Sequence, residues 1–319
     1  MSLKPIHLFD PFDCPPEIAS MTSLCDHFAA LRQVAKDRGL ELFWRGQADH
    51  RWGLQSALAR RVSSISTPTP ELLLQVEEQL LKEVSSWAAE LKHSDYRENK
   101  VARLAFLQHH GVPTRLIDFT RNPTIALFFA AESAPEEDGR IFAVFTPKFA
   151  IRHNKGKDID PATLKSNDLL MWVPTGAANF PRIDRQEGLF AVGGLPTSNR
   201  DLTAHDPVIG KSRRLLAEEV RGILSVPLRV ARSLEELERH LDEREKMGLF
   251  PVPYCLATRI HVNKASILRQ LRGGKSKRLR ALGLPAKGLS HASVYPDIGG
   301  FLSHSRTLDR LAHGVLMPS

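Results

Sequence analysis

Residues 107–123 constrain the fold of this chain more than any other segment, because they crowd polar groups onto a stiff loop. The segment contains two histidines, two arginines, an aspartate and two threonines around one glycine and two prolines. The apolar run at 125–131 predicts a buried helix that begins at Asn122-Pro123, since Asn is a frequent N-cap and Pro is favoured in a first turn. Functional sites are typically built on such a loop, held by a rigid element.

Sequence periodicity predicts an α+β fold. Helical spacing of apolar residues predicts helices over residues 22–38, 71–91, 100–109 and 233–246. Short apolar runs predict strands over residues 40–47, 140–145, 190–192, 223–226 and 255–262. Residues 147–184 and 193–207 look loop-rich and irregular. Because helices and strands are interspersed without strict alternation, we expect a single compact domain with a small mixed or antiparallel sheet flanked by helices.

Length and composition set the domain organisation. The 319 residues suffice for one large or two modest domains. We expect an N-terminal extension at residues 1–20, a main domain at 21–310 and a tail at 311–319. No apolar stretch approaches the roughly 20 residues that span a bilayer, and the start does not resemble a signal peptide. Three scattered cysteines argue against a disulfide framework or a cysteine zinc site. A cytoplasmic chain without membrane contact is the simplest expectation.

The net charge of +8 is concentrated near the C-terminus. Residues 246–296 hold ten Lys or Arg and no acid, whereas the rest of the chain holds 34 basic and 36 acidic residues. Clustered cations bind nucleic-acid phosphates through counterion release, and the same field would attract an anionic dinucleotide. The alternative is a solvated face that docks on acidic surface of the same protein. The candidate nucleic-acid-binding residues are Arg269, Arg272, Lys275, Lys277, Arg278 and Arg280.

Arg45 ends a predicted strand and precedes Gly46, which would let a ligand approach the backbone. The planar guanidinium matches a phosphate or carboxylate, although an Arg in this position also pairs readily with a surface acid. His110 is a candidate general base, or a histidine hydrogen-bonded within its loop. Asp118 either pairs with Arg115 to hold the loop or acts in catalysis. Adjacent histidines diverge and no further histidine stands at ligand spacing, so we expect no metal.

Several common enzyme motifs are absent from the sequence. It contains no Walker loop, no Gly-x-Gly-x-x-Gly fingerprint, no Gly-x-Ser-x-Gly elbow and no His-Glu-x-x-His. These absences exclude the usual nucleotidases, dehydrogenases, α/β hydrolases and zincins.

Three segments together resemble the FRG domain family of bacterial proteins. They are Phe43-Trp44-Arg45-Gly46-Gln47, residues 107–130 with Leu-Gln-His-His-Gly-x-Pro-Thr-Arg-Leu-x-Asp, and Arg182-Ile183-x-x-Gln186-x-Gly188-x-Phe190. A weaker fourth match is residues 295–300, where Gly299 stands in the place of an expected acid. The matches extend from about residue 20 to residue 305, so the resemblance implies an FRG-like domain over the predicted main domain, including the basic segment 246–296.

The chain is more distantly similar to ADP-ribosyltransferases, which implies an ADP-ribosyltransferase-like fold and NAD as substrate. In those enzymes an Arg on the first strand binds NAD, a Ser or Thr segment lies beside the nicotinamide, and a later Glu binds the ribose. The resemblance places Arg45, Gly46, Gln47, Thr120, Asn122 and Arg115 at the NAD. It places Gln186 or Glu187 at the ribosyl cation, which a carboxylate stabilises better than an amide. Adjacent strand residues face opposite ways, so only one of the two can serve.

The resemblance implies an NAD-dependent ADP-ribosyltransferase or NAD glycohydrolase, acting as an effector in a bacterial toxin or anti-phage system. His110 or Asp118 would orient the acceptor, which is a nucleic acid bound by the basic segment or a protein. Two alternatives remain open. One is an NAD-independent nucleic-acid-processing enzyme with His109, His110 and Asp118 as acid and base and Arg115 on phosphate. The other is a non-catalytic module that senses a ligand or phage protein through the same cleft.

Overall fold

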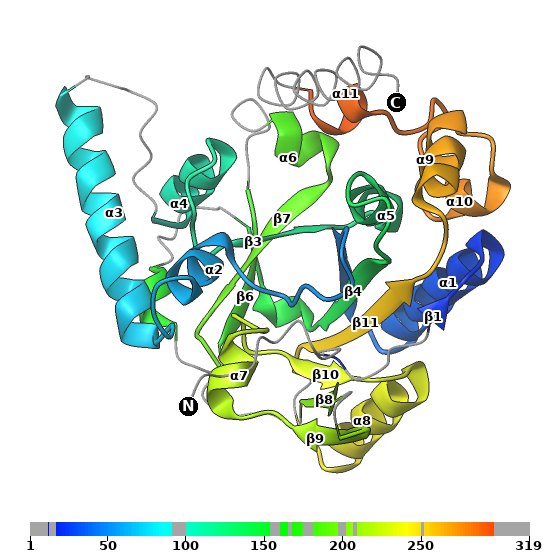
Figure 1. Cartoon of the computed structure of the whole chain (residues 1–319), viewed down its shortest axis with the longest axis horizontal. Coiled ribbons are helices and arrows are strands. Elements are labelled where there is room, and N and C mark those ends of the chain that lie inside the picture. Colours follow the sequence, from blue (N-terminus) through cyan, green and yellow to red (C-terminus); the bar gives the residue numbers. More distant parts are fainter. Residues whose placement is uncertain are drawn as a thin grey trace.

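The computed structural model has an α+β fold, in which a large sheet runs through the molecule and helices pack against it (Figure 1). None of the described helices combines the length and apolarity that a bilayer crossing needs. The predicted tail and much of the predicted extension lie outside the described residues, as do residues 297–300 of the fourth matching segment. The structure describes residues 12, 17–90, 100–153, 160–164, 168–174, 181–196, 202–206, 209–249 and 252–296.

The sheet is mixed, as predicted. The described strands are β1 (Glu17–Ile18), β2 (Glu41–Gln47), β3 (Ile117–Thr120), β4 (Gly139–Thr146), β5 (Ile151–His153), β6 (Leu169–Val173), β7 (Gly188–Gly193), β8 (Thr203–Asp206), β9 (Lys211–Arg214), β10 (Arg229–Ala231) and β11 (Tyr254–Ile260). Nine of them form one sheet in the order β1-β11-β4-β2-β3-β7-β6-β5, with β10 also beside β11. The pairs β1–β11, β10–β11 and β5–β6 are parallel, and the other described pairs are antiparallel. Strands β8 and β9 form a separate hairpin.

The four predicted helices are confirmed, with ends that differ by at most a residue or two. The described α-helices are α1 (Met21–Asp37), α2 (Ala57–Ser63), α3 (Pro70–Glu90), α4 (Lys100–His109), α5 (Pro123–Ala131), α6 (Pro181–Arg185), α7 (Ala217–Arg221), α8 (Leu234–Lys246), α9 (Lys264–Gly273), α10 (Lys277–Ala281) and α11 (His291–Val294). Helix α5 begins as predicted, because the Asn122 side chain accepts a hydrogen bond from the Thr124 amide and Pro123 occupies the first turn.

Side chains of the central strands alternate between two hydrophobic layers, as the two-residue repeat of a strand requires. In β4, Ile141 and Ala143 pack in the layer that contains α1 and α5. Phe142 and Val144 pack in the opposite layer, against residues 202–228. A third cluster fills the space between α3, α4 and the β6–β7 edge. Because β4 is buried on both faces, its residues 141–145 form an uninterrupted apolar run.

The sheet is larger than the sequence predicted. Strands β5 and β6 of this sheet, and β8 of the separate hairpin, lie in segments that we expected to be irregular. Strand β6 was not recognised because it is buried on both sides and gives no alternating pattern. The predicted strand at residues 223–226 is wrong. Its Leu224 makes an isolated bridge with Leu54, while the Leu224 amide bonds back to Val220 at 2.7 Å. This segment is apolar because it packs beneath the sheet, and apolarity alone does not distinguish that from strand pairing.

Candidate functional site

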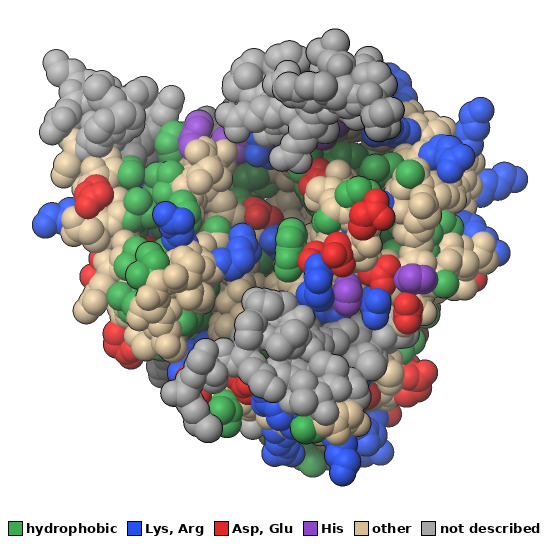
Figure 2. All heavy atoms as spheres, in the orientation of Figure 1, with side chains coloured by type: hydrophobic (Ala, Val, Ile, Leu, Met, Phe, Trp, Pro, Cys, Tyr) green, Lys and Arg blue, Asp and Glu red, His purple; other side chains and the backbone are tan. Residues whose placement is uncertain are grey.

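A large cavity opens where β2 and β3 diverge in the middle of the sheet. These antiparallel strands pair at one position, Trp44 with Thr120, and then separate. The space beside them has a volume of about 930 Å³, and the face of the molecule is hollowed there (Figure 2). Its lining comes from β2 and the loop after it, from Arg60 of α2, from the ends of α4 and α5, from β3 and α6, and from Tyr295.

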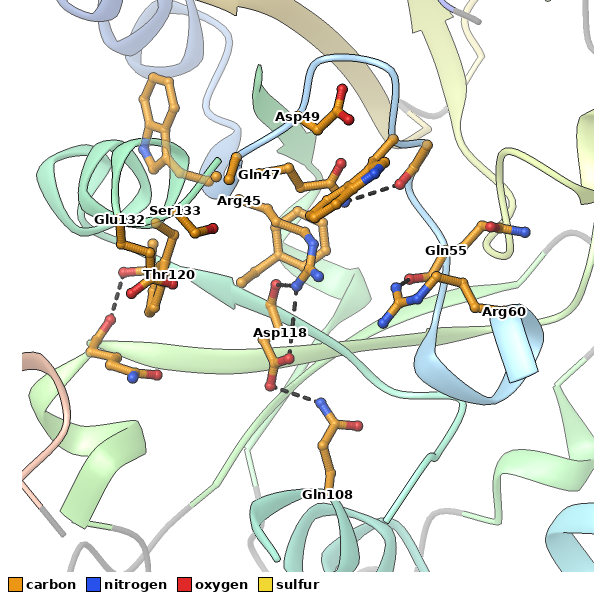
Figure 3. A pocket seen from close by; sticks show the side chains of 18 of the residues that line it. Arg45, Gln47, Asp49, Gln55, Arg60, Gln108, Asp118, Thr120, Glu132 and Ser133 are labelled. Atoms are coloured by element: carbon orange, nitrogen blue, oxygen red, sulfur yellow. Dashed lines mark hydrogen bonds and ion pairs between the residues drawn. The ribbon is translucent and has the colours of Figure 1, made fainter. Parts of the chain in front are cut away.

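Arg45 bridges the gap between the separated strands (Figure 3). Its Nη1 donates to the Asp118 backbone carbonyl at 2.8 Å and lies 3.7 Å from Oδ2 of the same residue. Gln108 Nε2, at the end of α4, donates to Asp118 Oδ1 at 2.8 Å. Burial lowers the pKa of Arg45, the Asp118 carboxylate raises it, and the nearby Arg60 lowers it again. Two guanidinium groups therefore lie near one carboxylate at this point of the cavity, and only Arg45 contacts it, which leaves positive charge available to an anion.

The loop after β2 forms the opposite wall and is held by its own polar groups. Gln47 Nε2 donates to the Gly53 carbonyl at 3.0 Å, and Asp49 accepts hydrogen bonds from the backbone and guanidinium of Arg51. This rigid loop presents Trp52, whose surface is 54% exposed although it lines the cavity. An exposed indole on a fixed loop offers a flat face on which an aromatic ring of a ligand can stack.

Lys264 fixes this loop to the end of α5. Its ammonium group is buried and donates to the Ser133 carbonyl at 2.9 Å, to the Ala134 carbonyl at 2.6 Å and to the Ala48 carbonyl. Burial lowers the pKa of Lys264, and acidic residues nearby raise it. One cation of the basic C-terminal segment is therefore an internal brace of the cavity wall and does not belong to a surface patch.

Glu132 and Tyr295 form a second hydrogen-bonded pair of polar side chains at the cavity. The Tyr295 hydroxyl lies 3.0 Å and 2.9 Å from the two Glu132 carboxylate oxygens, to which it donates. The guanidinium of Arg182 lies 5.3 Å from the centre of the Tyr295 ring. Desolvation by the surrounding atoms raises the pKa of Glu132 to about 7, and the tyrosine hydrogen bond opposes this shift. Glu132 is therefore a carboxyl group that exchanges a proton near neutral pH.

We expect the substitution Glu132→Gln to stabilise the protein more at pH 8 than at pH 5. The pKa of Glu132 rises from 4.5 to about 7 on folding, so its stabilising contribution is full below pH 4.5 and is lost as the pH rises through 7. Glutamine does not ionise and avoids this loss. Because Glu132 is exposed, solvent screening limits the expected gain to about 1 kcal/mol.

Urea denaturation of the two proteins at pH 5 and pH 8 measures this gain. The matched control is Glu136→Gln, an exposed residue of the same loop that lies outside the cavity lining. An equal stability difference at both pH values would show that Glu132 titrates as an ordinary surface carboxyl.

Six of the residues predicted for the site line the cavity, namely Arg45, Gly46, Gln47, Asp118, Thr120 and Gln186. The side chains of two of these residues are already hydrogen-bonded to backbone carbonyls of the protein. Thr120 Oγ1 donates to the Gln186 carbonyl at 2.6 Å, and Gln186 Nε2 donates to the Val294 carbonyl at 3.1 Å. The sequence interpretation of Gly46 requires correction, because the backbone that approaches it is that of α5. A Cβ at this position would lie 1.8 Å from the Ala126 carbonyl oxygen.

His110 and Arg115 lie outside the cavity lining. His110 is exposed and packs against Phe106, with ring centres 4.5 Å apart, whereas its neighbour His109 does line the cavity. Of the two alternatives for Asp118, the one in which it pairs with Arg115 is wrong. Arg115 Nε lies 2.9 Å from Oε2 of Glu77 in α3, and both side chains are buried. The arginine of the loop motif therefore joins the loop to α3, and it does not face a ligand in the cavity.

Asn122 and Glu187 hydrogen-bond to each other and hold segments of the fold together. The Asn122 amide donates to Glu187 Oε1 at 2.7 Å and to the Gly283 carbonyl at 3.0 Å, while its oxygen caps α5. Neither residue lines the cavity. The expectation that Gln186 and Glu187 alternate along a strand is wrong as well. Helix α6 ends before them, Glu187 has a positive φ of 46°, and β7 begins at the next residue.

The six predicted nucleic-acid-binding residues are all exposed and lie on or between α9 and α10. They form a basic surface at the edge of the molecule, away from the cavity lining. Two of them have partners within the protein. Arg278 Nη1 lies 2.5 Å from Asp26 Oδ1, and Arg280 Nε donates to the Gly274 carbonyl at 2.6 Å. Arg278 therefore pairs with an acidic residue of the same protein, which is the alternative interpretation of the basic segment.

Sequence reasoning missed several residues of the cavity, above all Trp52, Arg60 and Glu132, and it included Tyr295 only as the start of the weaker fourth matching segment. Glu132 directly follows the apolar run of α5, so an acid at the end of a buried helix was the available signal. Arg60 lies in a short helix without a distinctive motif, and only the fold brings it to Asp118.

Two clusters of described residues have the composition of a cation site, Asp49 with His50 and Glu137, and Glu17 with Asp138 and His261. An arginine already pairs with a carboxylate of each cluster. Arg51 Nη2 lies 2.7 Å from Asp49 and 2.8 Å from Glu137, and Arg259 Nη2 lies 2.6 Å from Asp138. These ion pairs with arginine account for the carboxylates Asp49, Glu137 and Asp138 in the two clusters.

Comparison with known proteins gives one match. Residues 41–139 match the family model of the FRG domain. No curated protein and no solved structure matches the chain. The matched range contains β2, the Trp52 loop, α2, β3 and α5, which supply much of the cavity lining. The similar segments at residues 182–190 and 295–300 lie outside it.

Proposed function

We propose, for a chain that carries an FRG domain at residues 41–139, that the cavity binds NAD as a substrate and that the protein cleaves its nicotinamide–ribose bond. The ADP-ribosyl group passes to an acceptor, which is a nucleic acid or a protein, or to water. The observation that carries this proposal is the part of the cavity wall where Arg45 and Arg60 both lie near the Asp118 carboxylate. The whole lining holds four arginines and three acids, so this wall is its most cationic part. Guanidinium groups are the preferred partners of phosphate oxygens in proteins.

The other walls of the cavity support a dinucleotide as the ligand. A volume of about 930 Å³ lies in the upper range of small-molecule and cofactor sites. Trp52, Phe129 and Tyr295 supply aromatic surface for the rings of such a ligand, and Gln47 and Gln108 supply amide groups. The mixture of cationic, aromatic and amide groups suits a molecule that carries phosphates and rings together.

The carboxylates of the proposed reaction are Asp118 and Glu132, since Gln186 and Glu187 are engaged elsewhere. The Asp118 side chain is 61% exposed at the cavity, where its negative charge stabilises a developing ribosyl cation. As the bond breaks, nicotinamide leaves with the bonding electrons and the acceptor oxygen bonds to the ribose carbon. The acceptor proton passes to Glu132, whose pKa of about 7 suits a general base.

Incubation with NAD labelled on the adenylate phosphate tests the proposal. The purified protein is incubated with this substrate alone and with RNA, DNA or cell lysate, and nicotinamide release and label transfer are measured. We expect turnover that the substitution Arg45→Ala lowers by roughly 10- to 150-fold, because a hydrogen bond to a charged group contributes about 1.5–3 kcal/mol. The matched control is Arg61→Ala, an exposed arginine of α2 outside the cavity lining, which should retain activity.

Absence of both nicotinamide and transferred label, together with no rise in melting temperature on adding NAD, would rule out the proposal. Cleavage of RNA without NAD would instead support the nucleic-acid-processing alternative.

A further inference from the structure

We infer that a side chamber of the cavity, between α2 and residues 111–113, is a subsite for a phosphate group of the ligand. The chamber has a volume of about 160 Å³ and opens beside Arg45. It shares Arg45, Arg60, Gln55, Gln108 and Asp118 with the main cavity, so a single ligand can occupy both spaces. This inference deepens the proposed function and rests on it for the identity of the whole ligand.

The walls of the chamber explain part of the loop motif. The backbone turns at Gly111 with a φ of 85°, and the following residues Val112 and Pro113 form one wall. Ala57, in the first turn of α2, faces them across the chamber. The Gly-Val-Pro sequence therefore bends the chain around a small space, while the polar residues on either side of it supply the groups at its mouth.

The charges around the chamber favour an anion. Its charged lining residues are Arg45, Arg60 and Asp118, and the rest of the lining is neutral. Asp118 opposes an anion, but its Oδ1 accepts a hydrogen bond from Gln108 and its backbone carbonyl accepts one from Arg45. Desolvation lowers the pKa of both arginines, but only the Arg45 side chain, at 19% exposed, is well shielded from water, whereas Arg60 is exposed. An anion between them therefore interacts most strongly with Arg45.

A phosphate suits this space better than a carboxylate does. Two guanidinium groups offer more donors than a carboxylate with two oxygens can use, whereas the diphosphate of NAD presents four non-bridging oxygens and two negative charges. Arg60 Nη1 is held by the Gln55 carbonyl at 2.8 Å, which fixes the direction of its side chain. The described groups therefore form a preorganised clamp with Arg60 on the side of α2 and Arg45 on the side of β2.

Calorimetric titration of the full chain with ADP and with adenosine tests the inference. We expect ADP to bind more tightly than adenosine. The substitution Arg60→Ala should weaken ADP binding about tenfold and leave adenosine binding unchanged. The neighbouring substitution Arg61→Ala is the matched control and should change neither. Ala57→Met fills the chamber without altering charge, and it should weaken ADP binding as Arg60→Ala does.

The outcomes separate this inference from the proposed function. If Arg60→Ala and Ala57→Met both bind ADP within twofold of the unmodified protein, the subsite is overturned even where NAD is cleaved. The same holds if the unmodified protein binds ADP no better than adenosine. If Arg60→Ala and Ala57→Met weaken ADP binding but no NAD is cleaved under any condition, the subsite stands and the proposed reaction fails. Circular dichroism and melting temperatures of the variants verify that each remains folded.

Discussion

The substitution Gly46→Ala is expected to destabilise the protein by about 3 kcal/mol or more. An added Cβ would lie 1.8 Å from the carbonyl oxygen of Ala126 and 2.8 Å from the amide nitrogen of Ala130. Both atoms belong to the backbone of α5, so no side-chain rotation relieves the clash. Either α5 or β2 must move within a packed core, which costs several kcal/mol. Urea denaturation of the two proteins measures this change.

Gly273→Ala is the matched control for this substitution. Gly273 ends α9, and a Cβ there would meet no atom within 4 Å. Alanine at this position should change the free energy of unfolding by less than about 1 kcal/mol, or raise it slightly. If Gly46→Ala unfolds at the same urea concentration as the unmodified protein, α5 does not approach β2 as closely as the structure indicates.

Arg115→Ala is expected to destabilise the protein by about 3–5 kcal/mol, the usual cost of breaking a buried ion pair from one side. The side chains of Arg115 and Glu77 are only 10% and 5% exposed. Burial raises the pKa of Glu77, and the guanidinium of Arg115 lowers it, so loss of Arg115 leaves a desolvated carboxyl without its compensating charge. Thermal or urea denaturation of the variant measures the effect.

The double variant Glu77→Gln with Arg115→Ala distinguishes loss of the ion pair from loss of packing. If the pair is responsible, the double variant should be less destabilised than the sum of the two single variants. The exposed pair of Arg239 and Glu236 serves as a control, since its atoms are 3.7 Å apart and Arg239 is 63% exposed. Arg239→Ala should cost less than about 1 kcal/mol. A similarly small effect for Arg115→Ala would contradict the buried pair.

Local sequence signals located five of the described helices, four strands of the large sheet and the centre of the site. The Asn122-Pro123 cap, the apolar run of β4 and the amphipathic patterns of the longer helices depend on neighbouring residues, so they were readable without the fold. The strand end with Arg45 and the polar loop to Asp118 were identified for the same reason. These two segments do meet at one cavity.

The roles within the loop were not readable from its sequence. Arg115 and Asp118 are three residues apart, yet one pairs with Glu77 in α3 and the other faces Arg45 in β2. Gln186 and Glu187 were expected on a strand, but a positive φ between a helix and a strand sends them to other partners. A motif specifies residue types, whereas the direction of each side chain depends on backbone geometry set by distant contacts.

The α+β class, several of the longer helices, the basic C-terminal segment and the two segments at the centre of the site could all be assigned from the sequence. The fold was needed to show that β2 and β3 separate after Trp44 and Thr120, that Arg60 and Glu132 join the cavity, and that Gly46 serves helix packing. The two groups of features differ in the range of the interactions that produce them. Caps and periodicity act over a few residues, whereas the cavity arises from contacts between segments far apart in the chain.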